Sequence, residues 1–117
     1  MNDTGIRPWG MYEVLASEAS FQVKTMTVNP GQRLSYQRHQ YRSEHWYVVL
    51  GDGLVTLDGT TLDVTVGSAV DVAVGVAHRI QNVGTGPLVF VEVQRGTYFG
   101  EDDIERLSDD YGRATSG

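Results

Sequence analysis

The sequence predicts an all-β domain, either a sandwich or a barrel of short strands. Runs rich in Val, Thr, Tyr and Leu recur about every eight to twelve residues, and turn residues, mostly glycine, separate them. The runs are FQVKTMTV (21–28), WYVVL (46–50), LVTL (54–57), TTLDVTV (60–66), SAVDVAV (68–74), HRIQNV (78–83) and LVFVEVQ (88–94).

Turns set the bounds of the first strands. Residues 12–17 (YEVLAS) follow an RPWG stretch and are predicted to form an edge strand. Residues 21–28 alternate apolar and polar side chains, as a strand with one buried face does, and stop at an Asn-Pro-Gly turn. Residues 46–50 stop at a Gly-Asp-Gly turn, which favours a change of direction there.

A hairpin is predicted next. LVTL is followed by Asp58-Gly59, a dipeptide suited to the two-residue type I′ turn that joins antiparallel strands. The runs that end at positions 66, 74 and 83 are each followed directly by glycine, and LVFVEVQ closes the series.

The C-terminal segment EDDIERLSDDYG differs from the rest and predicts a short helix over about residues 101–111. Acidic residues fill its first turn, where the helix dipole favours them. Ile104 and Leu107, with Tyr111, would form a narrow apolar stripe. Because no linker or repeat interrupts the chain, we expect one domain over residues 1–117 with a core at about 12–99.

Composition excludes several classes of function. The chain has 117 residues and no cysteine, so it has neither disulfides nor thiolate metal sites. Nine Lys and Arg against fifteen Asp and Glu give a net charge of −6, which argues against a nucleic-acid partner. No apolar run approaches the ~18–20 residues of a membrane span, and the first ten residues lack the layout of a signal peptide. We expect a soluble, cytoplasmic protein with no membrane partner.

Histidine and carboxylate gather in QRHQYRSEHWYVVLG (37–51). Gln37 and His39 are two positions apart and leave the same face of an extended strand. Glu44 shares parity with the apolar residues of the next strand, and His78 opens another strand after a glycine turn. Two imidazoles, a carboxylate and an amide oxygen suit Zn²⁺, Mn²⁺, Fe²⁺, Co²⁺ or Ni²⁺ and leave open positions for a substrate. The alternative is a polar turn with a surface Arg42–Glu44 ion pair worth about 0–1 kcal/mol.

These residues stand at the spacing of two motifs of the cupin superfamily, G-x5-H-x-H-x(3,4)-E-x6-G and G-x5-P-x-G-x2-H-x3-N. The chain resembles the first motif with Gln in place of the first His, and the second with Ala in place of Pro; the matching positions are Gly31, Gln37, His39, Glu44, Gly51, Gly67, Ala73, Gly75, His78 and Asn82. The resemblance implies a jelly-roll β-barrel whose metal is held by Gln37, His39, Glu44 and His78. Gln37 is a weaker ligand than imidazole, which predicts looser metal binding.

A narrower resemblance covers the chain from Arg7 to Arg113. The stretches that carry it are RPWG (7–10), PGQRLSYQRHQYRSEHWYVVLG (30–51), VTLDG (55–59), AHRIQN (77–82) and GEDDIERLSDDYGR (100–113). They look like the type II phosphomannose isomerase domain, which forms the C-terminal part of mannose-1-phosphate guanylyltransferase/mannose-6-phosphate isomerase proteins. The family often has a histidine where this chain has Tyr41, so Tyr41 is not counted as a ligand.

The implied reaction is the interconversion of mannose 6-phosphate and fructose 6-phosphate through a cis-enediol. We predict catalytic roles for Glu44, His45 and Arg42. His45 has a suitable unperturbed pKa of ~6.5 for a base, but strand parity points it outward, so Glu44 or a metal-bound hydroxide competes for that role.

The phosphate of the substrate requires arginine, whose planar fork binds it through two hydrogen bonds. Arg42 and Arg113 are the first candidates, followed by Arg38 and Arg7. Arg79 is less suitable because its parity points it away from the ligand. Each could instead be a solvated surface residue.

Other functions fit the same motifs. One is a non-catalytic cupin that binds a sugar or small molecule, and another is an isomerase or epimerase of a different phosphorylated or nucleotide-linked sugar. A metal-dependent oxygenase fits less well because those sites favour more histidine. Since an exposed edge strand needs cover, we also expect a homodimer. Trp9 and Trp46 are expected in the core or at an interface.

Overall fold

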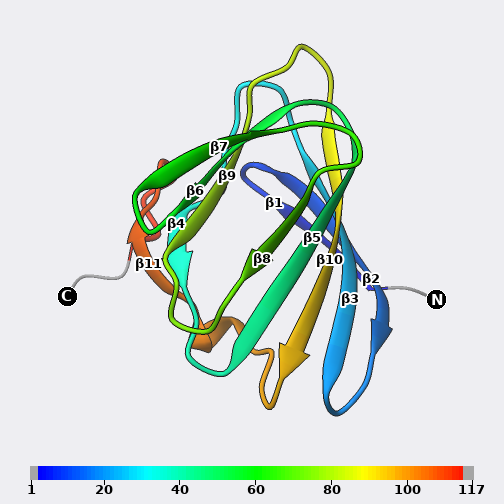
Figure 1. Ribbon diagram of the computed structural model, residues 1–117. Helices are drawn as coiled ribbons and strands as arrows, with labels where there is room; N and C mark the ends of the chain where they lie inside the picture. The colour runs from blue at the N-terminus through cyan, green and yellow to red at the C-terminus, as the bar shows by residue number, and fades with distance from the viewer. Residues whose placement is uncertain (1–2, 115–117) are drawn as a thin grey trace.

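The computed structural model describes residues 3–114, which form two antiparallel sheets packed face to face (Figure 1). The six-stranded sheet has the order β1-β2-β3-β10-β5-β8 and the five-stranded sheet the order β11-β4-β9-β6-β7. The strands are β1 (Thr4–Arg7), β2 (Gly10–Ser17), β3 (Phe21–Val28), β4 (Tyr36–Arg38), β5 (Arg42–Leu50), β6 (Gly53–Leu57), β7 (Thr60–Val64), β8 (Ala69–Val72), β9 (His78–Asn82), β10 (Leu88–Gly96) and β11 (Glu105–Ser108).

The all-β prediction is confirmed, but the sheets do not close into a barrel. Among residues 3–114 no named strand of one sheet pairs with a named strand of the other. The chain passes between the sheets through loops, for example from β3 to β4 and from β5 to β6, and not through continuous strands that belong to both. The two hydrogen-bonded ladders therefore remain separate layers of a sandwich.

The predicted strands appear close to their expected bounds. The run 21–28 is β3, and the hairpin β6–β7 turns at Asp58 and Gly59, whose φ angles of 45° and 82° are both positive, as a type I′ turn requires. The run 12–17 lies within β2. Contrary to the prediction, β2 is not an edge strand, because it lies between β1 and β3. The edge belongs to β1, which pairs with β2 from Thr4 to Arg7.

The prediction of a C-terminal helix over 101–111 is wrong. A single 3₁₀ turn covers Glu101–Asp103, and β11 then pairs with β4. Strand β4 has a free edge, and pairing satisfies its backbone while Glu105 of β11 bonds to Arg38 of β4 through both carboxylate oxygens. The Asp103 carboxylate accepts the backbone N–H groups of residues 40 and 41. Tertiary pairing thus outweighs the local helical pattern.

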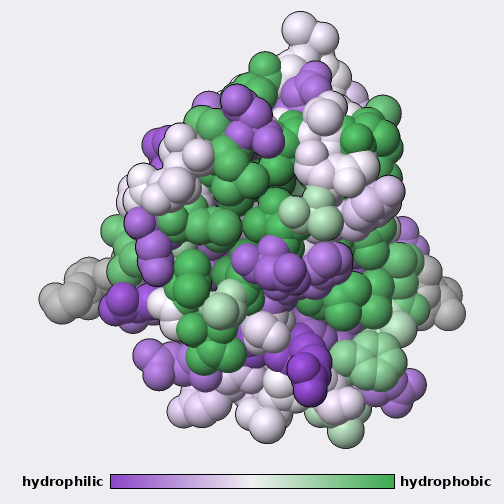
Figure 2. Space-filling view, in the orientation of Figure 1, coloured by the Kyte–Doolittle hydropathy of each residue, from purple (hydrophilic) through white to green (hydrophobic). Residues whose placement is uncertain are grey.

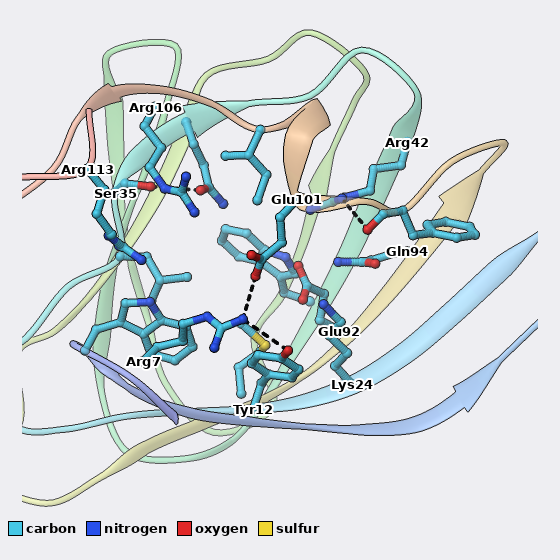
Figure 3. A pocket seen from close by; sticks show the side chains of 17 residues that line it. Arg7, Tyr12, Lys24, Ser35, Arg42, Glu92, Gln94, Glu101, Arg106 and Arg113 are labelled. Carbon is cyan, nitrogen blue, oxygen red and sulfur yellow. Dashed lines mark hydrogen bonds and ion pairs between the residues drawn. The ribbon is translucent and has the colours of Figure 1, made fainter. Parts of the chain in front are cut away.

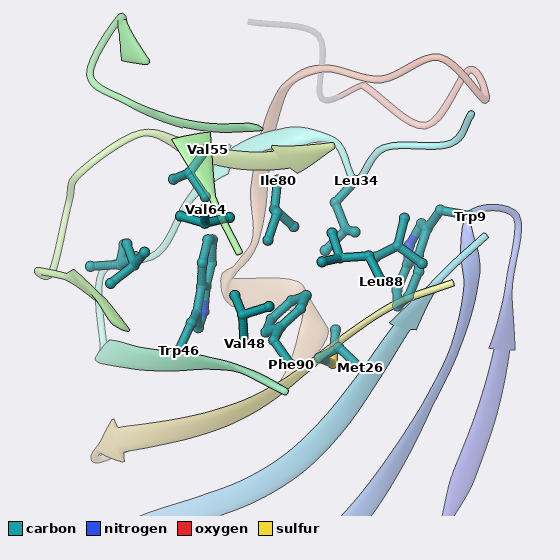
Figure 4. Close-up of a cluster of buried hydrophobic side chains, with 13 residues drawn as sticks. Trp9, Met26, Leu34, Trp46, Val48, Val55, Val64, Ile80, Leu88 and Phe90 are labelled. Carbon is teal, nitrogen blue, oxygen red and sulfur yellow. The ribbon is translucent and has the colours of Figure 1, made fainter. Parts of the chain in front are cut away.

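The core fills the space between the inner faces of the two sheets (Figure 4). Trp46 packs on Phe90 with ring centroids 5.3 Å apart, and both Trp9 and Trp46 are buried, as expected. The residues of this hydrophobic cluster are Trp9, Met26, Val28, Leu34, Trp46, Val48, Val55, Val64, Val70, Val72, Ile80, Leu88 and Phe90.

Along two central strands the inward side chains change from apolar to polar. In β5 the inward residues run from Val48 and Trp46 to Glu44 and Arg42. In β10 they run from Leu88 and Phe90 to Glu92 and Gln94 at positions of the same parity. One end of the interior is therefore apolar, and the other carries buried polar groups.

The outer surface follows the opposite parity. In β5 it presents His45, Tyr47 and Val49, all exposed. Hydrophobic and hydrophilic groups are interspersed over the face seen in Figure 2. No helix in the part of the chain that the structure describes is long and apolar enough to cross a membrane.

Gly51, directly after β5, provides a test of this packing. Its φ is 89°, and a Cβ atom there would lie 2.5 Å from the Pro87 carbonyl oxygen. We predict that Gly51→Ala lowers the free energy of unfolding by about 2–5 kcal/mol, from about 1–2 kcal/mol of backbone strain and about 1–3 kcal/mol of overpacking. Urea denaturation followed by tryptophan fluorescence measures the change.

The matched control is Gly59→Ala. Gly59 has a φ of 82° but no atom within 4 Å of its would-be Cβ, so only the strain of about 1–2 kcal/mol is expected. Equal losses in the two variants would show that the approach of Pro87 to the β5 turn does not matter.

Candidate metal centre and adjoining pocket

Three predicted ligands meet between the sheets at the polar end of the interior. His39 follows β4, Glu44 lies in β5 and His78 begins β9. The Nε2 atom of His39 is 3.6 Å from Glu44 Oε2, and that of His78 is 3.9 Å from Glu44 Oε1. One candidate ligand atom from each residue lies within 4.8 Å of the others. With this spacing of their ligand atoms, His39, Glu44 and His78 could bind one metal ion together.

Strand pairing brings these residues together. Gln37 of β4 lies opposite His78 of β9, and Glu44 of β5 lies opposite Gln94 of β10. The loop at His39 is anchored because its carbonyl oxygen accepts the backbone N–H of Gly75 at 2.8 Å. The centre is thus built from both sheets and depends on their face-to-face packing.

The imidazoles present free nitrogen atoms to the centre. His78 Nδ1 lies 2.9 Å from the Val76 carbonyl oxygen, which requires a proton on Nδ1 and leaves the Nε2 lone pair available. Among residues 3–114, the Nε2 atoms of His39 and His78 are both buried without a hydrogen-bond partner. Buried polar atoms are rarely left unpaired, and a divalent ion fits these donors.

The charges of the centre also suit a cation. Burial lowers the pKa of His39 to about 4 and lowers that of His78 as well, so both imidazoles are neutral near pH 7. Burial alone would raise the pKa of Glu44, but a hydrogen bond from Glu92 and the nearby histidines and Arg42 hold it well below its usual range. Two neutral imidazoles and a carboxylate therefore face one another.

Glu44 is the most heavily bonded member of the cluster. Its Oε1 accepts a hydrogen bond from Trp46 Nε1 at 3.0 Å, and its Oε2 accepts one from Arg42 Nε at 3.1 Å and one from Gln94 Nε2 at 3.4 Å. Arg42 is itself buried and also donates to the Phe99 carbonyl oxygen at 3.3 Å. The Arg42–Glu44 pair is thus an interior ion pair, and the surface alternative is wrong.

Gln37 stands on the same face as His78, but its amide oxygen already has a partner. Directly opposite residues of two antiparallel strands project to one side of the sheet. The Oε1 atom of Gln37 accepts a hydrogen bond from the Ser35 hydroxyl at 2.8 Å. The structure places Gln37 beside the cluster, while His39, Glu44 and His78 form it.

His45 lies on the other side of β5. Its side chain is 49% exposed, and Nδ1 is 2.6 Å from Asp71 Oδ1 on the neighbouring strand β8. The structure does not bring it to the cluster, in agreement with the parity of the strand.

A cavity lies between the sheets (Figure 3), next to the cluster, because its lining residues Arg42 and Gln94 bond to Glu44. Arg42, Glu92 and Gln94 line it, and Arg7 and Glu101 bond to each other across it, with Arg7 Nη2 2.7 Å from Glu101 Oε1. Its volume is about 60 Å³, less than the ~300 Å³ at which ligand pockets usually begin. In this conformation the cavity is therefore smaller than a usual ligand pocket.

Three of the four predicted phosphate ligands line this cavity. Arg7, Arg42 and Arg113 do so, whereas Arg38 lies outside it and bonds to Glu105. Arg113 forms the same kind of pair with Asp109, through two hydrogen bonds of 2.9 and 3.0 Å.

Sequence reasoning missed several polar residues that line the cavity, among them Lys24, Glu92, Gln94 and Arg106. A signal for three of them was present in the alternation of β3 and β10. Lys24 shares parity with the buried Met26 and Val28, and Glu92 and Gln94 share parity with Leu88 and Phe90. Polar residues at inward positions mark a site when several face one another.

Comparison with known proteins agrees with the fold and the motifs. A family model described as mannose-6-phosphate isomerase C-terminal matches residues 1–109. The chain is 50% identical over 107 residues to alginate biosynthesis protein AlgA of Pseudomonas aeruginosa, covering 92% of this chain and 22% of AlgA. It is 44% identical over 107 residues to a mannose-1-phosphate guanylyltransferase of Salmonella montevideo, covering 92% of this chain and 23% of that protein. The chain thus spans less than a quarter of these relatives.

Solved structures share this fold, and one of them is a cupin domain. The capsular polysaccharide assembling protein CapF of Staphylococcus aureus aligns with a TM-score of 0.76 and 21% identity, over 92% of this chain and 34% of CapF. The Cnp3 cupin domain of Schizosaccharomyces pombe aligns with a TM-score of 0.68 and 16% identity, over 73% of this chain and 64% of that domain. At these identities the likeness concerns the fold alone.

The buried neutral state of His39 predicts a pH dependence of the metal-free protein. Its folded pKa of about 4 is below the ~6.5 of an unfolded histidine, so the unfolded chain binds more protons between these values. Stability therefore falls as the pH falls through this window. We predict that chelator-treated wild type loses on the order of 1–2 kcal/mol more between pH 7 and pH 5 than His39→Gln does.

Urea unfolding at both pH values measures the difference. Because other titrating groups, Glu92 included, are present in both proteins, their contributions largely cancel in the comparison. Parallel pH dependences would contradict a neutral, buried His39.

Proposed function

The chain belongs to the family described as mannose-6-phosphate isomerase C-terminal, and on that premise we propose that it is a metal-dependent mannose-6-phosphate isomerase. It would interconvert mannose 6-phosphate and fructose 6-phosphate through a cis-enediol. The observation that carries the proposal is the buried cluster of His39, Glu44 and His78, with two unpaired Nε2 atoms, beside a cavity lined by arginine.

The donor set supports a bound divalent ion. His39, Glu44 and His78 would hold it, and Gln37 would join them if its amide oxygen left Ser35. An ion there supplies Lewis acidity toward the carbonyl and hydroxyl oxygens of the sugar, an effect worth several kcal/mol in comparable enzymes. The donors do not distinguish among Zn²⁺, Mn²⁺, Co²⁺, Ni²⁺ and Fe²⁺.

The residues around the cluster perform the remaining tasks. Arg42 and Trp46 hold Glu44 ionised and in one orientation through their hydrogen bonds. Arg113 and Arg7 line the cavity and would take the phosphate, each exchanging a carboxylate of this chain for the phosphate oxygens. The hydrophobic residues next to the cluster limit the access of water, which strengthens these charge interactions.

A coupled assay for fructose 6-phosphate tests the proposal. We predict that chelator-treated protein is inactive and that Mn²⁺, Co²⁺ or Zn²⁺ restores turnover of mannose 6-phosphate. His39→Ala should lower the metal-restored rate by about 100-fold or more, since loss of even a residue that supports a metal ligand typically costs about 10–100-fold. His45→Ala is the control, because that side chain lies on the outer face and should leave the rate within about twofold.

Two results would redirect the proposal. If an added ion raises the melting temperature and mannose 6-phosphate binds without turnover, the chain is a sugar-binding cupin. If the ion binds and another sugar phosphate is turned over instead, the isomerase class stands and the substrate assignment falls.

The phosphate subsite is tested by comparing two arginines. Arg113 and Arg38 each bond to a carboxylate through two nitrogen atoms, but only Arg113 lines the cavity. We predict that Arg113→Ala raises KM for mannose 6-phosphate by about 10- to 100-fold, as expected for the loss of charged hydrogen bonds worth about 1.5–3 kcal/mol. Arg38→Ala should leave KM unchanged. Equal effects would show that the phosphate does not reach this part of the cavity.

A further inference from the structure

Lys24, the chain's single lysine, lies in β3 and lines the cavity beside the metal cluster (Figure 3). We propose that the Lys24 amine is the catalytic base that carries the proton between C2 and C1 of the bound sugar phosphate. This inference rests on the proposed isomerase function and assigns a step to a residue outside the cupin motifs.

The position of Lys24 is set by three strands. Lys24 of β3 lies opposite Glu92 of β10, and its ammonium nitrogen is 4.7 Å from the centre of the Tyr12 ring of β2. Ion pairs at this cavity include Arg7 with Glu101, Arg42 with Glu44 and Arg113 with Asp109. Within residues 3–114, Lys24 forms no ion pair with a carboxylate. The amine is thus held at the cavity wall without being tied to a carboxylate.

The other ionisable groups of the cavity are committed to other contacts. Glu44 accepts hydrogen bonds from Arg42, Trp46 and Gln94 and faces both histidines. Glu92 is hydrogen-bonded to Glu44.

Glu101 and His45 are also unsuitable as the base. Glu101 is paired with Arg7. His45 lies on the outer face with Asp71. Arginine does not lose its proton in proteins, and the Tyr12 hydroxyl accepts a hydrogen bond from Arg7 Nη2 at 3.2 Å. Among the side chains that line the cavity, the Lys24 amine is therefore our candidate base.

The surroundings of Lys24 favour its neutral form. Burial lowers the pKa of the Lys24 ammonium, and the positive charge of Arg42 lowers it further, while Glu92, Glu44 and Glu101 act in the opposite direction. The Tyr12 ring faces the amine from β2, and this contact favours the charged form. A lowered pKa increases the fraction of free amine near neutral pH, which is the form that accepts a proton.

The step balances without any co-reactant. The neutral amine takes the C2 proton of the open-chain aldose, and the electrons of that C–H bond form the C1=C2 double bond as the C1 carbonyl becomes an enolate oxygen. The hydroxyl proton on O2 passes to O1. The ammonium then returns its proton to C1 as the C2 carbonyl forms, so that fructose 6-phosphate leaves and the amine is neutral again.

Kinetics of Lys24 variants test the assignment. We expect Lys24→Met and Lys24→Arg to lower kcat by about 10²- to 10⁴-fold, the usual contribution of a general base, with KM changed by less than about threefold. Lys24→Arg keeps a positive charge and the length of the side chain, so it separates base catalysis from charge and packing. Circular dichroism and thermal unfolding verify that both variants fold.

Chemical rescue gives a readout that a structural role would not produce. With Lys24→Ala, added ethylamine should restore turnover in proportion to its neutral fraction, so that rescue grows with pH. Guanidinium, which remains protonated, should not restore turnover.

The single lysine also allows a direct measurement without substrate or metal. Reductive methylation with ¹³C-formaldehyde labels Lys24 and the amino terminus only, and NMR then gives the titration midpoint of each. The Lys24 midpoint should lie below that of the same dimethyl-lysine in the urea-unfolded chain.

The outcomes separate this inference from the proposed function. An active wild type with equally active Lys24→Met, or Lys24→Arg with wild-type kcat, rejects the base role and leaves the isomerase intact. A Lys24 midpoint at or above that of the unfolded chain also rejects it. A wild type that turns over no sugar phosphate with any ion rejects the proposed function and, with it, this step.

Discussion

The buried carboxylate of Glu44 is the constraint on which the rest of the site depends. An ionised carboxylate in a protein interior is costly unless it is paired and fully hydrogen-bonded. Trp46, Arg42 and Gln94 each donate to it, and Glu92 supplies a further hydrogen bond. These donors lie in β5 and β10, two neighbouring interior strands of the six-stranded sheet. The ionised state of Glu44 is therefore provided by the sheet that also builds the core.

That dependence explains why core and site share their strands. The inward side chains of β5 and β10 are apolar at one end of each strand and polar at the other. The change occurs between Trp46 and Glu44 in β5 and between Phe90 and Glu92 in β10. Trp46 belongs to both parts, since its ring packs on Phe90 and its Nε1 donates to Glu44. Rigid packing of the apolar end thus fixes the orientation of the carboxylate at the other end, which is what a preorganised site requires.

Features that depend on neighbouring residues in the chain could be predicted from the sequence, whereas features that depend on contacts between distant residues could not. Alternation and turn chemistry are local, and they located β3, the β6–β7 turn at Asp58-Gly59 and the outward direction of His45. Motif spacing predicted that His39, Glu44 and His78 lie together, as they do. The C-terminal segment could not be predicted in this way, because its conformation is decided by the free edge of β4, more than sixty residues away in the chain. Likewise, the position of Arg38 outside the cavity depends on its pairing with Glu105 of the distant β11, which no local pattern encodes.

The same C-terminal segment explains how an acidic chain can line a cavity with arginine side chains. The net charge of −6 repels anions at long range, yet the cavity wall carries Arg7, Arg42 and Arg113. Two of these are neutralised by carboxylates that follow β10, Glu101 and Asp109. A phosphate that binds to Arg7 or Arg113 would have to displace the carboxylate already paired with that arginine. Because a phosphate can accept from several arginines at once, whereas each carboxylate serves one, this exchange favours a doubly charged ligand over a singly charged one. The segment for which helix prediction fails is thus the one that would favour a phosphorylated sugar in the proposed reaction.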